Sequence, residues 1–141
     1  MKPLYRIYEP SDLGCLVELM KQLGYEHTRD SLTANVRRVK TREGEVFVAD
    51  VSGNVVGAIS AMLDVRMAEG VSGEIVSLVI SDQARGLGLG RGLVLMAEAW
   101  LKQYTSNIRI RANVIRTEAH EFYEKQGYRL KKSQAVFQKE L

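Results

Sequence analysis

The sequence predicts a single domain of the mixed α/β class, in which a largely antiparallel sheet of about six or seven strands carries helices on both faces. Two apolar runs with the period of a strand, residues 45–50 and 55–63, are joined by the tight turn Ser52-Gly53-Asn54, which indicates a hairpin. Other stretches carry apolar residues at helical spacing. In residues 74–104 a run rich in Val and Ile passes through a glycine-rich turn into such a stretch, which predicts a strand, a turn and a helix.

The composition sets the broad class of the protein. The chain has 141 residues, of which 45% are hydrophobic, so we expect residues 1–141 to form one domain with its own core. The N-terminus lacks the apolar segment of a secretion signal and no apolar run is long enough to span a bilayer, so we expect a cytoplasmic protein. Cys15 lies among leucines, where we expect it to be buried, and it has no neighbour at metal-ligand spacing.

The periodicity predicts each element in turn. Strands are expected at residues 5–8, 45–50, 55–63, 74–80, 108–114 and 133–139, the last of them at a sheet edge. Helices are expected at residues 13–23, ended by Gly24, at residues 32–39, at residues 89–104, and from Thr117 to a closing Gly127. The polar segment 64–72 contains Gly70 and is expected to be a loop.

The turn after the central strand has the features of an anion site. Glycines alternate with other residues from Gly86 to Gly92, which lets the backbone come close to a ligand. The start of the following helix leaves N–H donors pointing out of the chain. Arg85 and Arg91 would oppose the helix dipole unless a negative group lay between them, so we expect a phosphate or pyrophosphate there.

Two common phosphate motifs are excluded by spacing. No Lys and hydroxyl residue follow these glycines as the nucleotide P-loop requires. The dinucleotide pattern G-x-G-x-x-G fails because its last position holds Arg91, Leu93 or Leu95, depending on the starting glycine. A turn that merely joins strand to helix is the alternative, but it does not explain four glycines with two arginines.

Two motifs resemble those of the GNAT superfamily of acetyl-CoA-dependent N-acetyltransferases. Residues 85–90, Arg-Gly-Leu-Gly-Leu-Gly, resemble its Q/R-x-x-G-x-G/A signature, and residues 113–128 resemble its later motif, whose core is Ala-x-x-Phe/Leu-Tyr-Glu-Lys-x-Gly-Phe/Tyr. The resemblance covers essentially the whole chain and implies a sheet whose central strand and its successor splay around the cofactor. One departure is Arg116, where many family members carry Asn.

The resemblance implies acetyl-CoA as cosubstrate and assigns residues to it. The pyrophosphate would be held by the backbone at Arg85, Gly86, Leu87, Gly88, Leu89, Gly90 and Arg91. The strand before the loop would be interrupted by a bulge, so that the backbone of Leu78, Val79 and Ile80 is free to pair with the pantetheine arm and to supply an oxyanion donor. Asn113 would supply the cofactor contact in place of the Asn that many family members carry at the position of Arg116.

Catalytic and acceptor residues follow less directly. Tyr123 matches the family tyrosine near the cofactor sulfur and would act as general acid, although a purely packing role is the alternative. Glu74 is the candidate general base, with His120 or a chain of water molecules as alternatives. In the resemblance the polar loop after Gly24 lies over the acceptor site, so Tyr25 and Glu26, with His27, are candidate substrate contacts, unless this segment is only a solvated connector.

The chain is therefore expected to be an N-acetyltransferase that moves the acetyl group of acetyl-CoA to a primary amine of a small molecule, by direct attack in a ternary complex. A protein or peptide acceptor and a non-catalytic CoA-binding sensor are the alternatives. A nucleic-acid-binding domain is disfavoured because the net charge of +3 is spread along the chain. No metal or membrane partner is expected, and a homodimer is possible, with the late strand near Phe137 suited to pairing.

Overall fold

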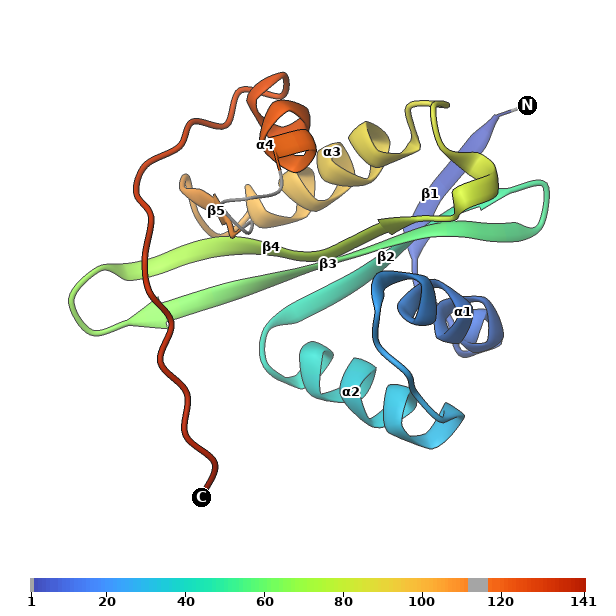
Figure 1. The fold of residues 1–141 in the computed structure, drawn as a ribbon, viewed down its shortest axis with the longest axis horizontal. Coiled ribbons are helices and arrows are strands. Elements are labelled where there is room, and N and C mark those ends of the chain that lie inside the picture. The colour runs from blue at the N-terminus through green and yellow to red at the C-terminus, as the bar shows by residue number, and fades with distance from the viewer. Residues whose placement is uncertain (1, 112–116) are drawn as a thin grey trace. The chain divides into compact units, whose positions relative to one another are not determined.

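The computed structural model describes residues 2–111 and 117–141 (Figure 1). The chain divides into two compact units, Met1–Ile110 and Arg111–Leu141. The first unit holds the sheet and the helices α1 to α3. The second unit holds helix α4 and the C-terminal segment.

The first unit is built on a five-stranded sheet in the order β1-β2-β3-β4-β5. Its strands are β1 (Pro3–Ile7), β2 (Gly44–Val51), β3 (Asn54–Arg66), β4 (Gly70–Ile80) and β5 (Ile108–Ile110). Neighbours from β1 to β4 are antiparallel, whereas β5 runs parallel to β4. The predicted mixed α/β class is confirmed, with five strands in the described residues instead of six or seven.

The hairpin between β2 and β3 forms where the turn residues predicted it. Ser52 and Gly53 both have positive φ, 52° and 89°, as the two central residues of a type I′ turn require. The Asp50 carboxylate accepts a hydrogen bond from the backbone N–H of Gly53 at 2.8 Å. This turn sets the register in which β2 and β3 pair.

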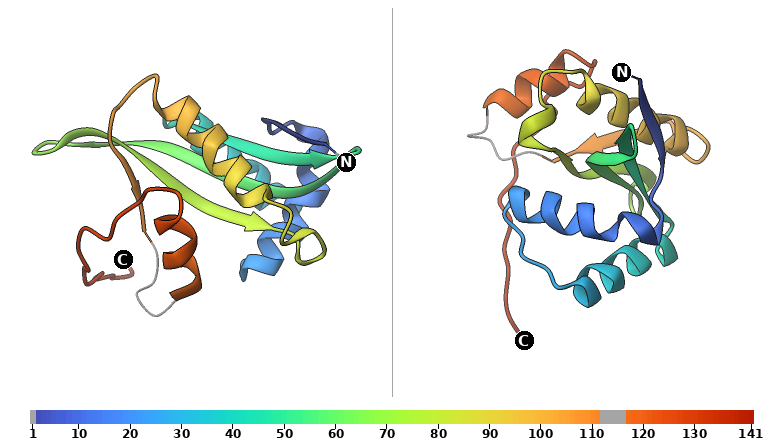
Figure 2. Two further views of the ribbon diagram at one scale, coloured as in Figure 1. Left: turned by 90° about the horizontal axis from the view of Figure 1, so that it is seen from above. Right: turned by 90° about the vertical axis from the view of Figure 1, so that its right-hand side faces the viewer.

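Helices cover both faces of this sheet, as predicted. Helices α1 (Leu13–Leu23) and α2 (Arg29–Thr41) pack on one face and α3 (Leu89–Leu101) on the other (Figures 1 and 2). Apolar residues of α1 and α2, such as Leu16 and Leu32, form a core with the inward-facing residues Val46 and Val48 of β2. On the opposite face Leu93, Val94, Ala97 and Leu101 are fully buried. Each helix thus buries one apolar face, although Tyr104, which the spacing of residues 89–104 placed in the third helix, lies beyond the end of α3 and is 52% exposed.

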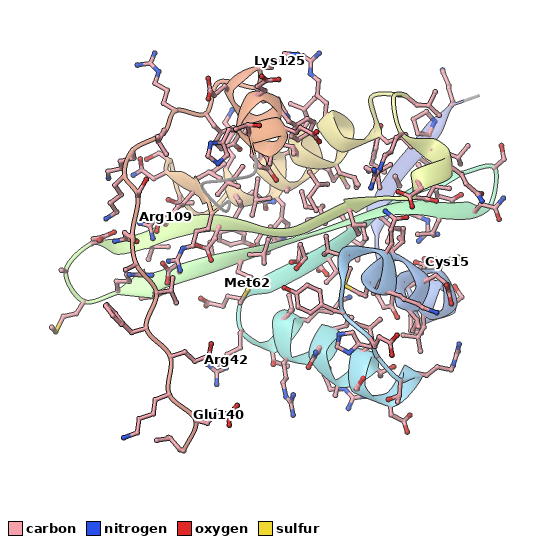
Figure 3. All side chains as sticks on the ribbon, viewed as in Figure 1. Cys15, Arg42, Met62, Arg109, Lys125 and Glu140 are labelled. Atoms are coloured by element: carbon pink, nitrogen blue, oxygen red, sulfur yellow. The ribbon has the colours of Figure 1, made fainter. Side chains whose placement is uncertain are left out.

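Three expectations about local structure are wrong. The segment 64–72 is mostly strand, because β3 continues to Arg66 and pairs with β4 from Gly70 onward. Residues 133–139 form no strand, since alternation supplies no neighbouring strand edge to take up the backbone hydrogen bonds. Cys15 is exposed, because it lies off the stripe of leucines by which α1 faces the core (Figure 3).

Two short turns of 3-10 helix complete the unit, η1 (Pro10–Asp12) before α1 and η2 (Asp82–Ala84) after β4. Asp12 in η1 is only 5% exposed, and Arg6 of β1 donates to both of its carboxylate oxygens at 2.8 and 2.9 Å. Arg6 also donates to Asp50 at 3.2 Å. The hydrogen bond from Arg6 holds the pKa of Asp12 below its ordinary value.

We expect Asp12→Asn to remove a pH-dependent part of the stability. Because the folded-state pKa of Asp12 is lowered, its contribution is complete above the ordinary pKa of about 4 and is lost as the pH falls through the lowered value. At neutral pH the variant should lose about 2 kcal/mol of unfolding free energy, the worth of hydrogen bonds to a charged group. Below pH 4 the difference between the two proteins should shrink.

Urea unfolding between pH 2 and 8 measures this difference. Asp82→Asn is the control, because Asp82 forms an ion pair with Arg85 alone among the residues that the structure describes, and its side chain is 66% exposed. The control should change stability little at any pH. A constant difference between Asp12→Asn and the natural chain across the pH range would contradict the prediction.

Candidate functional site

The segment from the end of β4 to α3 forms an open, glycine-rich loop. Gly86 and Gly88 have φ values of 79° and 77°, which glycine adopts without strain. A Cβ atom built on either residue would have no described atom within 4 Å. The side of the loop on which those two positions lie is therefore open.

The start of α3 leaves backbone donors beside this loop. The N–H of Gly92 donates to the carbonyl of Gly88 at 3.1 Å, so the amides of Leu89, Gly90 and Arg91 precede the first hydrogen bond of the helix. No side chain caps them in the part of the chain that the structure describes. Leu89 is only 2% exposed, so its side chain belongs to the core and does not face a ligand. Such a helix start suits an anion.

The two arginines differ in their surroundings. Arg85 forms an ion pair with Asp82 at 2.9 Å, and the two side chains are 65% and 66% exposed. Arg85 therefore has a negative partner within the chain, but an exposed pair of this kind contributes only about 0–1 kcal/mol. Arg91 is exposed and makes no ion pair with the described residues.

The glycines also divide by role. Gly90 lies in the first turn of α3, whereas Gly92 lies further along it, against the ring of Tyr5 in β1. A Cβ atom at position 92 would overlap that ring. Gly92 thus serves the packing of α3 on the sheet and not the approach of a ligand.

Strand β4 carries a β-bulge just before its last residues. Ser60 pairs with Val76 and Ala58 with Val79, so two residues of β4, Ser77 and Leu78, lie opposite one residue of β3. Ser77 has a φ of +60°. The hydroxyl of Ser60 donates to the carbonyl of Val76 at 3.0 Å and so holds the strand next to the bulge. The bulge implied by the resemblance is present.

The pairing of β4 with β5 is short. Cα partners run from Gly73 to Ile75, and among the described residues β4 has no strand neighbour on that side beyond Ile75. Leu78, Val79 and Ile80 follow this point, and Val79 faces the core. The backbone of this segment is therefore arranged as an edge that an extended ligand could join.

The candidate general base and the candidate acceptor contacts lie on separate elements of the first unit. Glu74 is half-buried on β4, at the position that pairs with Arg109 of β5 and Met62 of β3. Tyr25 is 61% exposed in the connection between α1 and α2. Glu26 is exposed in the same connection and, with Glu18, Lys21 and other residues, lines a hollow of about 190 Å³.

His27 and Arg109 add two local networks. The ring of His27 lies 3.0 Å from the Ser31 hydroxyl at the start of α2. Arg109 bonds to Asp64 at 3.3 Å and to Glu69 at 2.9 Å, and so ties β5 to the β3–β4 hairpin (Figure 3). The hairpin that was expected to be a loop is thereby held as a strand pair.

The second unit contains α4 (Thr117–Glu124), on which Tyr123 is half-buried. Its ring lies 5.1 Å from that of Phe122 and 6.1 Å from that of Tyr128, centroid to centroid. Gly127 has a φ of 94°, and the N–H of Tyr128 donates to the carbonyl of Tyr123 at 3.1 Å, so this helix is closed by glycine as predicted. His120 is half-buried on the same helix.

Asn113 and Arg116 lie outside the described residues. Within the described residues, no group of three His, Cys, Asp or Glu side chains could hold a metal ion. None of the described helices is both long enough and apolar enough to cross a membrane.

Sequence reasoning missed one polar contact at the loop. The side-chain amide of Gln22 in α1 donates to the carbonyl of Ile80 at 2.7 Å and accepts from the N–H of Asp82 at 2.9 Å. Gln22 and Asp82 also border a groove of about 560 Å³, which Cys15 and Ser81 line as well. No local pattern marks Gln22, because a polar residue near a helix end ordinarily indicates a solvated position.

Residues 3–128 match the model of the Acetyltransferase (GNAT) family. The chain belongs to the GNAT acetyltransferase family. It is accordingly an acyltransferase. The glycine loop, the bulge in β4 and the start of α3 correspond to the structural features that the resemblance to the family implied. Two curated relatives and one solved structure extend this finding.

The aminoalkylphosphonate N-acetyltransferase of Salmonella typhimurium is 32% identical over 117 residues, which cover 81% of this GNAT chain and 74% of that protein. The glucosamine 6-phosphate N-acetyltransferase of Trypanosoma brucei brucei is 30% identical over 96 residues, 64% of this chain and 65% of that one. Among solved structures, AAC(6')-Iy in complex with a CoA bisubstrate analogue aligns over 100% of both chains with a TM-score of 0.88. Its identity of 15% makes this a likeness of fold.

Proposed function

We propose that this GNAT enzyme transfers the acetyl group of acetyl-CoA to the primary amine of a small molecule by direct attack in a ternary complex. The observation that carries the proposal is the succession of a bulged strand, an open glycine loop and an uncapped helix start within residues 76–91. These are the groups that an extended, diphosphate-bearing cosubstrate needs from a protein backbone.

Acetyl-CoA fits the residues that the loop offers. The amides of Leu89, Gly90 and Arg91 would donate to its diphosphate, and the exposed guanidinium groups of Arg85 and Arg91 would neutralise its charge. Backbone groups of residues 78–80 would pair with the pantetheine arm, and one of their amides would stabilise the oxyanion. Asn113 would add a contact by the family resemblance. The cosubstrate supplies an acyl group already activated as a thioester.

Side chains of this chain would carry out the two proton transfers of the reaction. An amine attacks only when neutral, so a carboxylate such as Glu74, directly or through water, would remove its proton. The hydroxyl of Tyr123 would donate a proton to the departing thiolate, as the matching tyrosine of the family motif implies.

The relatives favour a small amine as acceptor. The names of both curated relatives describe amines that also carry a phosphonate or a phosphate, and AAC(6')-Iy was solved with the bisubstrate analogue CoA-S-monomethyl-acetylneamine. Tyr25 and Glu26 would contact the acceptor from the connection between α1 and α2, where both are exposed. A protein amino group and a non-catalytic CoA sensor are the competing readings.

The first experiment is a screen for acetyl-CoA consumption with aminoalkylphosphonates, amino sugars and their phosphates, aminoglycosides, polyamines and peptides. We expect thiol release only with small amines. Turnover with peptides alone would move the acceptor class to proteins, and CoA binding without turnover on any amine would favour the sensor.

Tyr123→Phe separates catalysis from binding. We expect kcat to fall by about 100-fold, the usual worth of one general acid, because the thiolate must then leave without a proton. The dissociation constant of CoA, measured by calorimetry, should stay unchanged. Tyr128→Phe is the matched control, since it removes a hydroxyl from a neighbouring ring of the same unit. Equal losses of kcat in the two variants would contradict the assignment.

Removing both arginines tests the diphosphate site. In Arg85→Ala/Arg91→Ala we expect kcat/KM for acetyl-CoA to fall by about 100-fold, about tenfold for each lost charge-assisted contact. The value for acetylpantetheine, which lacks the diphosphate, should be unaffected. A parallel loss for both thioesters would show that the arginines act on the fold or on another part of the ligand.

We also propose that the protein forms homodimers through its C-terminal segment. Val136 and Phe137 are 87% and 94% exposed there and lie next to each other, so a second chain could cover both apolar side chains. Light scattering should give about twice the chain mass of 15.8 kDa for the natural protein and the single mass for Phe137→Asp. A monomeric natural protein at high concentration would overturn this proposal.

A further inference from the structure

Gln22 joins helix α1 to the junction between β4 and the glycine loop. Its side chain is half-buried, and it makes two hydrogen bonds with backbone groups 58 and 60 residues away, the carbonyl of Ile80 at 2.7 Å and the N–H of Asp82 at 2.9 Å. The amide of Gln22 thus pairs with the carbonyl before Ser81 and with the N–H after it. A neighbouring strand would ordinarily supply these two hydrogen bonds.

The junction that Gln22 holds leads directly into the proposed diphosphate site. Ile80 is the last residue of β4 and Asp82 the first of η2. On the other side, the N–H of Ser81 donates to the carbonyl of Val56 in β3 at 2.7 Å. Asp82 is also the partner of Arg85 at 2.9 Å. Gln22 and β3 therefore fix the direction in which the chain leaves the sheet.

The other end of the link is the connection between α1 and α2, residues 24–28. Gln22 lies in the last turn of α1, which ends at Gly24 with a φ of 106°. The N–H of Tyr25 donates back to the carbonyl of Met20 at 2.8 Å, so the connection begins in a fixed direction. At its far end the backbone N–H of Thr28 and the hydroxyl of Ser31 lie 3.0 Å apart in a capping box.

Taking the proposed function as given, we propose that Gln22 is a positioning residue that couples the glycine loop to residues 24–28. A ligand held by the backbone of residues 78–80 and 85–91 also fixes the junction between them, which carries the two groups to which Gln22 bonds, and through Gln22 the last turn of α1. CoA binding thereby orders the segment that contacts the acceptor. By linkage the acceptor strengthens CoA binding to the same degree.

Hydrogen exchange tests this coupling with CoA as the only ligand. In the natural protein CoA should slow amide exchange both in residues 81–91 and in residues 24–28. Gln22→Met keeps the volume of the side chain and removes both hydrogen bonds. In this variant exchange in residues 81–91 should be faster without ligand, CoA should no longer slow residues 24–28, and its dissociation constant should rise about tenfold.

Two further variants sharpen the result. Gln22→Glu keeps an acceptor for the N–H of Asp82 but replaces the donor by a second carboxylate oxygen, which repels the carbonyl of Ile80. Exchange in residues 81–91 should therefore be faster, and the affinity for CoA lower, than in the natural protein. Gln83→Met is the matched control, because Gln83 borders the same groove and makes no side-chain hydrogen bond with the described residues. It should behave as the natural protein does.

The outcomes are separable from those of the proposed function. A natural protein that does not bind CoA in calorimetry overturns the proposed function, while faster exchange of residues 81–91 in unliganded Gln22→Met would still support the structural tie. The coupling is overturned if CoA binds the natural protein and leaves residues 24–28 unprotected, or if it protects them equally in Gln22→Met. Should Gln22→Met unfold, Gln22→Glu decides by the same two measurements.

Discussion

The backbone hydrogen bonding along β4 is interrupted, and this interruption shapes the candidate site. A strand inside a sheet ordinarily uses every N–H and carbonyl on its neighbours. In this GNAT protein the bulge at Ser77 and Leu78 shifts the ladder to β3, and the described pairing with β5 stops at Ile75. Backbone groups of the last residues of β4 are thereby kept for a ligand, at the point where the chain enters the glycine loop.

Such a break needs support, and the structure supplies it with side chains. The hydroxyl of Ser60 donates a hydrogen bond to the carbonyl of Val76 on one side of the bulge. The side-chain amide of Gln22 donates one to the carbonyl of Ile80 at the end of the strand. Both contacts are made by polar groups within reach of the core, where an unsatisfied carbonyl would be costly. The open strand end is thus an organised feature and not a frayed one.

Electrostatics in the two regions of the first unit serve different ends. Arg6, Asp12 and Asp50 form a largely desolvated network that ties β1, η1 and the β2–β3 hairpin together, and it acts on stability. Arg85 and Arg91 are exposed, and the one pair that Arg85 makes is weak. A cation that is loosely paired at a helix start is available for an incoming anion at small cost.

Local signals in the sequence predicted most of the helices and strands and the family, whereas the contacts around each of them depend on how the chain folds. The helical spacing of apolar residues predicted α1 and α3, and the turn residues Ser52 and Gly53 predicted the hairpin. The glycines and arginines predicted the loop. Each of these predictions rests on residues that are close together in the sequence. The residues that a side chain contacts, in contrast, are often far from it in the sequence. Cys15 proved exposed, Gly92 proved to be a contact for Tyr5, and Gln22 proved to hold a strand end 58 residues away, since burial and pairing depend on which segments the fold brings together. Residues 133–139 show the same limit, because alternation predicts the shape of a strand but not the neighbour that its backbone requires.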